Sequence, residues 1–467
     1  MAENSESQLK PKKKLTVFDA ISSSLAQMAP AAGIYYGFPV IFAASGIGSP
    51  LTILLATLAI AIVGISLTNF SKIHPSSGSL VKYISMTFGD IVGTTASLVF
   101  LIGTIFLAGS AFIELGGWTT DSLALYGIHI HWIASTIILG LIVWLITVVG
   151  INSSTKIAAV ALFIEVAVLL TVSVLVFIYT PSPLSLKPFA FSSIRGGLSG
   201  LSLAFPLAIY LFIGFENSVA LAEETNNPKR NTARAVLVSI SIMSVFFIFV
   251  NYSVIQGFSN HVDDLIKSKN PFIDLADQYL GRFSVLAIIA GFTSIFGMTI
   301  ACLNGFSRIA FNSAREGLIY RKLSKVSKWG TPISTLTLLS GLGILAAVLM
   351  GLFSDGWVDA FGYLSTIGTI PLLLIYSLLN LAVIFYKKEK WPFHKKYLFP
   401  TIGLFSILVP IWAMVQPGQP APVSYFPWII LVVCAASLIY SWFTVKKKSP
   451  ISAKFSIYET VVKEEES

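Results

Sequence analysis

Charged and metal-binding residues are scarce in this sequence of 467 residues. Asp, Glu, Lys and Arg together make up 11% of the chain, which has two cysteines and five histidines. Cys302 and Cys434 fall in apolar segments where packing explains them, and the histidines form no cluster with metal-ligand spacing. No catalytic group of acids, bases and nucleophiles is visible either. We therefore expect no metal site, no cofactor, no disulfide framework and no enzyme.

Apolar residues are what the chain has in abundance. They make up 55% of it, and the mean hydropathy is +0.80, which is typical of an integral membrane protein. Continuously apolar runs such as residues 287–305 favour helices over the alternating strands of a β-barrel. We expect an all-α membrane protein with about twelve transmembrane helices, each of about 20 residues. They are placed near residues 17–44, 51–71, 91–118, 132–149, 154–180, 199–224, 233–257, 283–306, 333–353, 360–385, 398–415 and 425–445.

The net charge of +9 follows the expected topology and does not indicate nucleic acid as a partner. The tail 1–16 is polar and has no cleavable signal sequence. If this tail is cytoplasmic, about 26 of the 31 basic residues lie in inner segments, as the positive-inside rule requires. We expect a multi-pass protein of the cell membrane in which the tail 1–16 and the tail 446–467 are both cytoplasmic.

Two of the apolar segments contain helix-breaking residues. Pro30 and Gly33 interrupt the first segment within residues 27–39, and Pro206 and Gly214 interrupt the sixth, which also carries the carboxylate of Glu216. A charged group at the centre of a membrane helix costs about 3 kcal/mol, so it usually faces protein or a cavity. Loose backbone is likewise tolerated there only inside protein or along a cavity. Both segments therefore indicate a binding site.

Paired breaks in two halves of a chain are typical of inverted-repeat transporters with a substrate near the bilayer midplane. The repeats are expected at 17–180, with helices one to five, and at 199–385, with helices six to ten. Helices eleven and twelve, at 398–445, lie outside this symmetry.

Three motifs resemble the amino acid-polyamine-organocation (APC) superfamily of permeases over essentially the whole chain. They are residues 212–216 with 222–231, residues 74–83 with Phe88-Gly89, and residues 307–317 followed by Thr331-Pro332. The resemblance implies a LeuT-like fold with five-plus-five inverted repeats and broken helices 1 and 6. The first break departs from the familiar glycine-small-glycine run, because it reads Ala31-Ala32-Gly33-Ile34-Tyr35. Relatives with an alanine-proline-alanine break span amino acid and amine substrates.

The two breaks could together bind a zwitterion. Free amides at residues 29–33 suit a carboxylate, and carbonyls at residues 210–214 can accept hydrogen bonds from an ammonium group. The alternative is that the prolines and glycines only kink or pack the helices. The expected substrate-binding residues are Ala29, Ala31, Ala32, Gly33, Ile34, Tyr210, Phe212, Gly214 and Glu216.

Individual side chains have competing interpretations. The resemblance implies that Tyr210 is the aromatic lid over the substrate. Phe212 shapes the pocket or packs the core, and Glu216 contacts a cationic substrate, titrates, or bonds to a neighbouring helix. Tyr36 is equally open between site and packing.

Coupling to an ion could involve Glu165. It takes the place where some relatives carry a lysine linked to coupling, and a carboxyl buried in a membrane helix can exchange protons. A static link to a basic group is the alternative. Sodium is a less favoured coupling ion than protons. Its oxygen ligands would be Ser22, Ser23, Ser24, Thr293 and Ser294, which are residue types common in membrane helices. Uncoupled exchange is the third option, and Glu114 is expected at the outer interface.

The charges near the inner loops form either a gate or a solvated surface. They are Glu223, Glu224, Arg308, Arg315 and Glu316. The function expected from all these features is secondary active transport of amino acids by alternating access, with proton coupling. The alternatives are a transporter or exchanger of polyamines or other organic amines, with Glu216 and Glu165 receiving the positive charges, and an ion channel, for which no selectivity-filter repeat is present. Nothing in the sequence indicates an oligomeric state.

Overall fold

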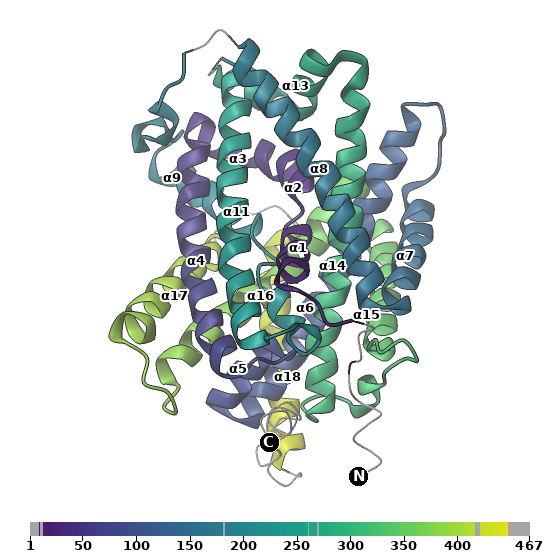
Figure 1. Ribbon diagram of the computed structural model, residues 1–467, viewed down its shortest axis with the longest axis vertical. Coiled ribbons are helices and arrows are strands. Elements are labelled where there is room, and N and C mark those ends of the chain that lie inside the picture. Colours follow the sequence, from purple (N-terminus) through teal and green to yellow (C-terminus); the bar gives the residue numbers. More distant parts are fainter. Residues whose placement is uncertain are drawn as a thin grey trace.

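The computed structural model describes residues 9, 13–180, 183–259, 261–268, 270–415 and 421–446. Helices account for almost all the regular structure within these residues, and no strand is present there beyond one isolated bridge between Leu15 and Thr225 (Figure 1). Most of the predicted cytoplasmic tails, 1–16 and 446–467, lies outside the described residues.

The first half of the chain contains five expected membrane crossings. The first crossing is divided into three helical pieces and a π-helical turn, Gly33–Gly37, and a short helix, α5, precedes the third crossing. The elements are α1 (Val17–Gln27), α2 (Pro30–Ala32), α3 (Phe38–Ser45), α4 (Ser49–Ile73), α5 (Ser79–Phe88), α6 (Asp90–Ala124), α7 (Trp132–Val149) and α8 (Ile151–Tyr179).

The second half contains the remaining crossings. The sixth is divided into α9 and α10, and two short helices, α12 and α13, precede the eighth. The elements are α9 (Leu198–Tyr210), α10 (Asn217–Ala220), α11 (Pro228–Gly257), α12 (Val262–Lys267), α13 (Pro271–Leu280), α14 (Val285–Arg315), α15 (Ile333–Gly351), α16 (Trp357–Phe385), α17 (Phe399–Met414) and α18 (Phe426–Lys446).

Every one of the twelve predicted membrane segments coincides with helix in the structure. By length and composition, nine helical stretches of the described chain can cross a membrane. The smaller number arises because residues 17–73 count as one stretch although it holds two crossings, and because α9 and α17, of 13 and 16 residues, are short. The prediction missed the short helices α5, α12 and α13, which are too brief to give a membrane signal.

The packing of the helices repeats between the two halves. The third crossing of the first half, α6, packs against α16, the fifth crossing of the second half. Equivalently, the third crossing of the second half, α14, packs against α8, the fifth crossing of the first half. In the same way α1 contacts α11 and α9 contacts α4. An internal two-fold axis that exchanges the halves produces this pattern, so it supports an inverted repeat. The helices α17 and α18 have no counterparts; they cover α4, α6 and α16 from outside.

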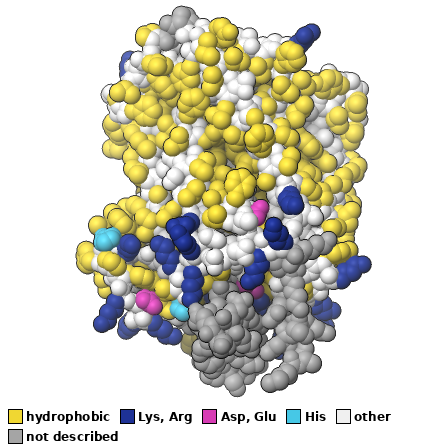
Figure 2. Space-filling view, in the orientation of Figure 1, with side chains coloured by type: hydrophobic (Ala, Val, Ile, Leu, Met, Phe, Trp, Pro, Cys, Tyr) yellow, Lys and Arg dark blue, Asp and Glu magenta, His cyan; other side chains and the backbone are white. Residues whose placement is uncertain are grey.

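The outer surface is largely apolar. Large side chains such as Phe163 and Val245 are more than 70% exposed on the helices that surround the bundle. Figure 2 shows apolar side chains over most of one face, while Lys and Arg gather toward the end of the molecule where α18 ends. This distribution suits a bilayer around the apolar zone and a charged surface in water.

A short extended segment before α1 is attached to the other half of the protein. The N–H of Leu15 donates to the Glu224 carbonyl (2.7 Å), and the N–H of Asn226 donates to the Leu15 carbonyl (2.9 Å). The Leu15 side chain is buried against Ile151 and Leu221. The start of the first helix is therefore fixed to the loop that follows α10.

Candidate functional site

The first helix breaks between α1 and α2. The helix α1 ends at Gln27, and Ala29 takes a left-handed conformation with φ of +47° before Pro30 starts α2. Proline has no N–H to continue the helix, and it disfavours helical geometry in the residue before it. The prediction of a break within residues 27–39 is confirmed.

The second break occupies residues 211–216, which form turns between α9 and α10. Gly214 has a φ of +115° and lies against the first break, because a Cβ built on it would be 2.6 Å from Gln27 Cγ. Pro206 does not take part, since α9 continues past it to Tyr210. The break predicted here is therefore confirmed, but its local cause is Gly214 and not Pro206.

Replacing Gly214 with alanine is expected to lower the free energy of unfolding by about 1–3 kcal/mol, because φ would be strained and the new methyl group would press on Gln27. Thermal unfolding in detergent measures this. Gly341 is the matched control, since a Cβ there meets no atom within 4 Å. Equal melting temperatures for the two variants would mean that the close approach of the breaks is unimportant for stability.

A cavity of about 340 Å³ lies between the two breaks and the helices α6, α14, α16 and α17. Its wall is mostly apolar. The lining consists of Gln27, Met28, Ala29, Ala32, Gly33, Tyr36, Gly37, Val40, Leu107, Ser110, Ala111, Glu114, Pro206, Leu207, Ile209, Tyr210, Leu211, Ile213, Met298, Cys302, Phe306, Phe361, Gly362, Ser365, Thr366, Thr369, Leu373, Pro410 and Met414. This volume and character suit a small organic molecule.

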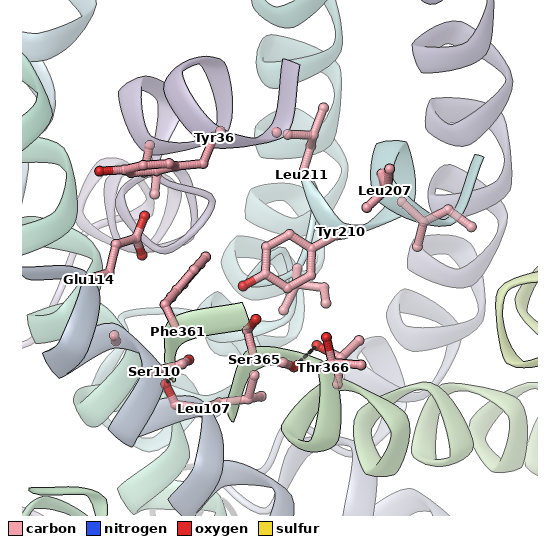
Figure 3. A pocket seen from close by; sticks show the side chains of 18 of the residues that line it. Tyr36, Leu107, Ser110, Glu114, Leu207, Tyr210, Leu211, Phe361, Ser365 and Thr366 are labelled. Carbon is pink, nitrogen blue, oxygen red and sulfur yellow. Dashed lines mark hydrogen bonds between the residues drawn. The ribbon is translucent and has the colours of Figure 1, made fainter. Parts of the chain in front are cut away.

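Four of the nine predicted binding residues line this cavity: Ala29, Ala32, Gly33 and Tyr210. The Tyr210 ring projects into the space from the end of α9, opposite Glu114 and Tyr36 (Figure 3), and it is 37% exposed. This placement is compatible with the predicted lid.

The other five predicted binding residues are absent from the described lining. Ile34 is buried in the core, and Phe212 packs edge-to-face on Phe247 with ring centroids 5.7 Å apart. Gly214 faces Gln27, and the Glu216 carboxylate accepts the Gly214 N–H (3.1 Å) within its own turn. Ala31 is turned toward α8. For Phe212 the structure thus favours the packing alternative. The Glu216 bond stays within its own turn, and its other oxygen, Oε1, has no partner among the described residues.

The amides of the first break already have acceptors within the chain. The Ala31 N–H donates to Glu165 Oε2 (3.0 Å), and the Ala32 N–H donates to Ser294 Oγ (3.2 Å). The Gly33 and Ala29 amides bond to backbone carbonyls of residues 29 and 26. A substrate carboxylate would have to displace one of these partners. The predicted carboxylate site is therefore occupied by the protein's own groups in this structure.

At the second break, two carbonyl groups remain available. The carbonyl oxygens of Leu211 and Ile213 accept no hydrogen bond from the described residues, and both residues line the cavity. Such oxygens can accept hydrogen bonds from an ammonium group. The part of the site predicted to bind an amine is thus open.

The expectation that Glu114 lies at the outer interface is wrong. Its side chain is 3% exposed and lines the cavity from α6. A signal was present in the sequence, because Leu107, Ser110, Ala111 and Glu114 have the i, i+3, i+4, i+7 spacing of one helix face, and all four line the cavity. Tyr36, left open between site and packing, also belongs to this wall.

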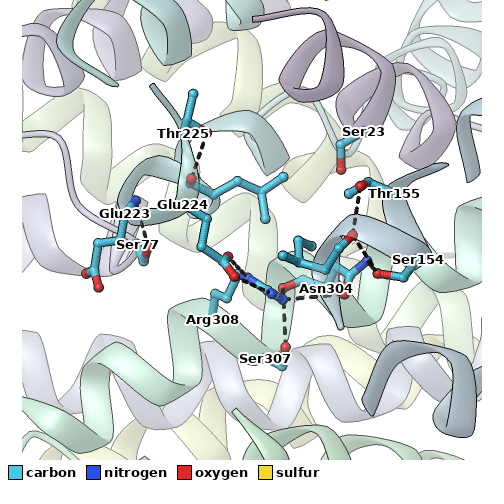
Figure 4. A network of polar contacts seen from close by, with 12 residues as sticks. Ser23, Ser77, Ser154, Thr155, Glu223, Glu224, Thr225, Asn304, Ser307 and Arg308 are labelled. Carbon is cyan, nitrogen blue, oxygen red and sulfur yellow. Dashed lines mark hydrogen bonds and ion pairs between the residues drawn. The ribbon is translucent and has the colours of Figure 1, made fainter. Parts of the chain in front are cut away.

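Ion pairs join the helices at the end of the molecule where α1 begins (Figure 4 shows the central pair). Arg308 on α14 forms a two-point ion pair with Glu224, and both side chains are 0% exposed. Arg308 also donates to the Asn304 carbonyl (2.8 Å), and Asn304 donates to Ser154 on α8 (3.0 Å). For Glu224 and Arg308 the solvated-surface interpretation is wrong.

The remaining charged pairs of this layer are less buried. Arg315 pairs with Glu223, and Lys82 pairs with Glu316 at 2.7 Å with side chains 17% and 19% exposed. We call these three pairs, Glu224–Arg308, Glu223–Arg315 and Lys82–Glu316, the ion-pair layer. It links α14 to α5 and to the loop after α10.

Four of the five side chains considered for sodium, Ser23, Ser24, Thr293 and Ser294, have other partners. Ser24 donates to the Phe215 carbonyl and accepts the Ser218 N–H, and Asn217 donates to Ser23. These serines therefore face α10, whereas Ser294 contacts Ala32. No group of three or more His, Cys, Asp or Glu suited to a metal is present among the described residues.

Comparison with known proteins gives one family over most of the chain. The family model described as Amino acid permease matches residues 15–443. Similar curated proteins include a methylthioribose transporter of Bacillus subtilis (strain 168), 26% identical over 83% of this chain and 85% of the relative. A branched-chain amino acid permease, BcaP, of the same organism is 23% identical over 83% of this chain and 84% of the relative. Its aspartate-proton symporter is 24% identical over 71% of this chain and 66% of the relative.

Proposed function

Because this chain belongs to the amino acid permease family, we propose that it is a secondary active transporter that moves amino acids across the cell membrane. The family is one of membrane transporters and implies the LeuT-like fold predicted from the sequence motifs. The relatives are named for branched-chain amino acids, aspartate and methylthioribose, so a small organic substrate is common to them.

The observation that carries the proposal is the position of the cavity. It lies between the two breaks, at the contact of helices from both halves of the chain, and at one end the buried pair Glu224–Arg308 joins α14 to the loop after α10. Alternating access would follow if the bundle of helices that carries both breaks rocks against the remaining helices, with the pair Glu224–Arg308 breaking and re-forming. The repeats are placed at 17–180 and 199–385.

The orientation follows from charge. Lys and Arg gather at the end that carries the ion-pair layer (Figure 2), and basic loops favour the cytoplasmic side. Both termini are therefore placed in the cytoplasm, and the ion-pair layer acts as the inner gate. The cavity then receives substrate from outside when this gate is closed.

Protons are the proposed coupling ion, with Glu165 as the carrier. Its carboxylate is 1% exposed and bonds to the first break through the Ala31 N–H. A gain of a proton turns an acceptor into a donor and weakens its hold on that amide, so protonation and the geometry of the break are linked. A proton symporter among the relatives favours this coupling over sodium.

Uptake into proteoliposomes tests the proposed function. A panel of radiolabelled amino acids and amines, with and without proton or sodium gradients, should reveal saturable uptake of at least one amino acid. Absence of saturable uptake or exchange for the whole panel would overturn the proposal.

Replacing Tyr210 with alanine is expected to reduce the uptake of every accepted substrate by about tenfold, equivalent to about 1.4 kcal/mol of lost contact in the cavity. The same proteoliposome assay measures it. Tyr126 is the matched control, because it is 63% exposed and does not line the cavity. Normal uptake by the Tyr210 variant would remove this residue from the site.

A further inference from the structure

Glu114 is a buried residue whose carboxylate faces the cavity and has no partner among the described residues. It is 3% exposed, and it makes no hydrogen bond or ion pair with any described residue, although its side chain lines the cavity (Figure 3). The described lining contains no Lys, Arg or His and no other acid. A buried carboxylate that lacks a compensating charge loses hydration without replacement. A cation in the cavity would supply the missing interaction.

The surroundings of Glu114 also suit a cation. Tyr36 is held edge-to-face against Trp118 and Trp357, with ring centroids 5.9 and 5.7 Å apart, and its buried hydroxyl has no partner among the described residues. That hydroxyl can accept a hydrogen bond from an ammonium group. Aromatic rings of the lining can attract the charge further. Leu211 and Ile213, whose carbonyl oxygens accept no hydrogen bond from the described residues, line the cavity with Tyr210 and are candidates for additional acceptors.

The groups that could bind an anion, in contrast, already have partners within the protein. The Ala31 and Ala32 amides at the first break bond to Glu165 and Ser294, and no basic side chain is present in the described lining. The cavity thus offers acceptors and negative charge, and the donors of its described lining are neutral hydroxyl, thiol and amide groups. In a neutral zwitterion the only amine lies next to a carboxylate that Glu114 repels, whereas a second, terminal amine can pair with Glu114 at a distance from that carboxylate.

We propose that Glu114 makes this site selective for substrates that carry a net positive charge, through an amine bound between the Glu114 carboxylate and the Tyr36 hydroxyl. The proposal rests on the proposed function and names the substrate class of the same cavity. The shared chemistry is a protonated primary amine, which a basic amino acid or a diamine can supply. Both fit a cavity of about 340 Å³.

Three compounds of similar length distinguish a basic amino acid, a neutral amino acid and a diamine as the substrate. Ornithine carries two amines and a carboxylate, norvaline lacks the terminal amine, and putrescine lacks the carboxylate. In proteoliposomes with the wild-type chain, ornithine, putrescine or both should have a KM about tenfold or more below that of norvaline, because a buried charge pair is strongly coupled. Which of the two cations is preferred identifies the source of the amine.

The variant Glu114→Gln keeps the size and removes the charge. It should raise the KM of the cationic substrate about tenfold or more and change that of norvaline by less than about threefold. Thr119→Ala is the control, since Thr119 lies on α6 outside the described cavity lining and its replacement leaves the charge unchanged. An equal change for all substrates, or a wild-type preference for norvaline, would overturn the proposal while leaving the transport function intact. Uptake of none of the panel would instead overturn the transport function.

A labelling experiment covers the case in which Glu114→Gln does not fold. Cys302 lines the same cavity, and Cys434 can be replaced with alanine to leave one thiol in the described chain. A cationic methanethiosulfonate should modify Cys302 faster than an anionic one of similar size, and ornithine or putrescine should protect it. Faster modification by the anionic reagent, without protection by either cation, would contradict a negative cavity.

Discussion

Replacement of Arg308 with alanine is expected to lower the free energy of unfolding by about 3–5 kcal/mol and to abolish gradient-driven uptake. The substitution leaves the Glu224 carboxylate, which is 0% exposed, without its partner, and an uncompensated buried charge is among the most costly single changes in a protein. It also removes the donor to the Asn304 carbonyl. Thermal unfolding in detergent and uptake into proteoliposomes measure the two effects.

The matched control is Lys82→Ala. Lys82 belongs to the same ion-pair layer, but it and Glu316 are partly exposed, and such a pair contributes about 1 kcal/mol or less. Arg308→Lys supplies a second comparison, because it keeps the charge and loses the two-point geometry. An Arg308→Ala protein as stable as Lys82→Ala would show that burial of the pair does not govern stability. Full uptake by this variant would mean that the pair is not part of the inner gate.

Replacement of Glu165 with glutamine is expected to abolish the accumulation of substrate driven by an inward proton gradient. The amide is nearly the same size and keeps an oxygen for the Ala31 N–H, but it cannot gain or lose a proton. Exchange of labelled for unlabelled substrate should continue, since the cavity itself is unchanged. Uptake against a concentration gradient, compared with exchange at equal concentrations, measures the difference.

Ser294→Ala is the control for this second variant. It removes the neighbouring acceptor, which bonds to the Ala32 N–H, without removing a titratable group. We expect reduced stability of the break but retained proton-driven accumulation. A Glu165→Gln protein that accumulates substrate as well as the wild type would end the coupling role of Glu165, and loss of both accumulation and exchange would indicate a structural role.

The helices and the breaks could be predicted from the sequence because their causes are local. A proline removes the N–H of its own residue, and a glycine permits a positive φ, so Pro30 and Gly214 indicate broken helices from local chemistry. Pro206 shows that a proline alone does not decide the matter, since α9 continues past it. The length of an apolar segment, which predicts a membrane helix, is likewise read from consecutive residues. The short helices α5, α12 and α13 escaped because they are defined by packing and not by length of apolar sequence.

The walls of the cavity could be predicted only in part, because they depend on how each helix is rotated about its axis. A motif predicts Tyr210 as a cavity residue. The prediction for Glu114 is wrong because it used only the position of Glu114 along α6 and not the face of the helix on which it lies. Phe212 shows the opposite error, since it lies beside the break but turns toward Phe247. The partners Glu165 and Ala31 are 134 positions apart in sequence, so nothing local indicates their hydrogen bond.

The extended segment at Leu15 has a mechanical consequence. Its two backbone hydrogen bonds attach the entry of the first broken helix to the exit of the second, and Ser24 and Asn217 connect the same two helices nearer the cavity. The half-helices at this end are thus cross-braced and must swing as one lever. Opening of the inner side would therefore separate this pair of half-helices from α14, to which side chains such as Arg308 and Asn217 join it among the described residues.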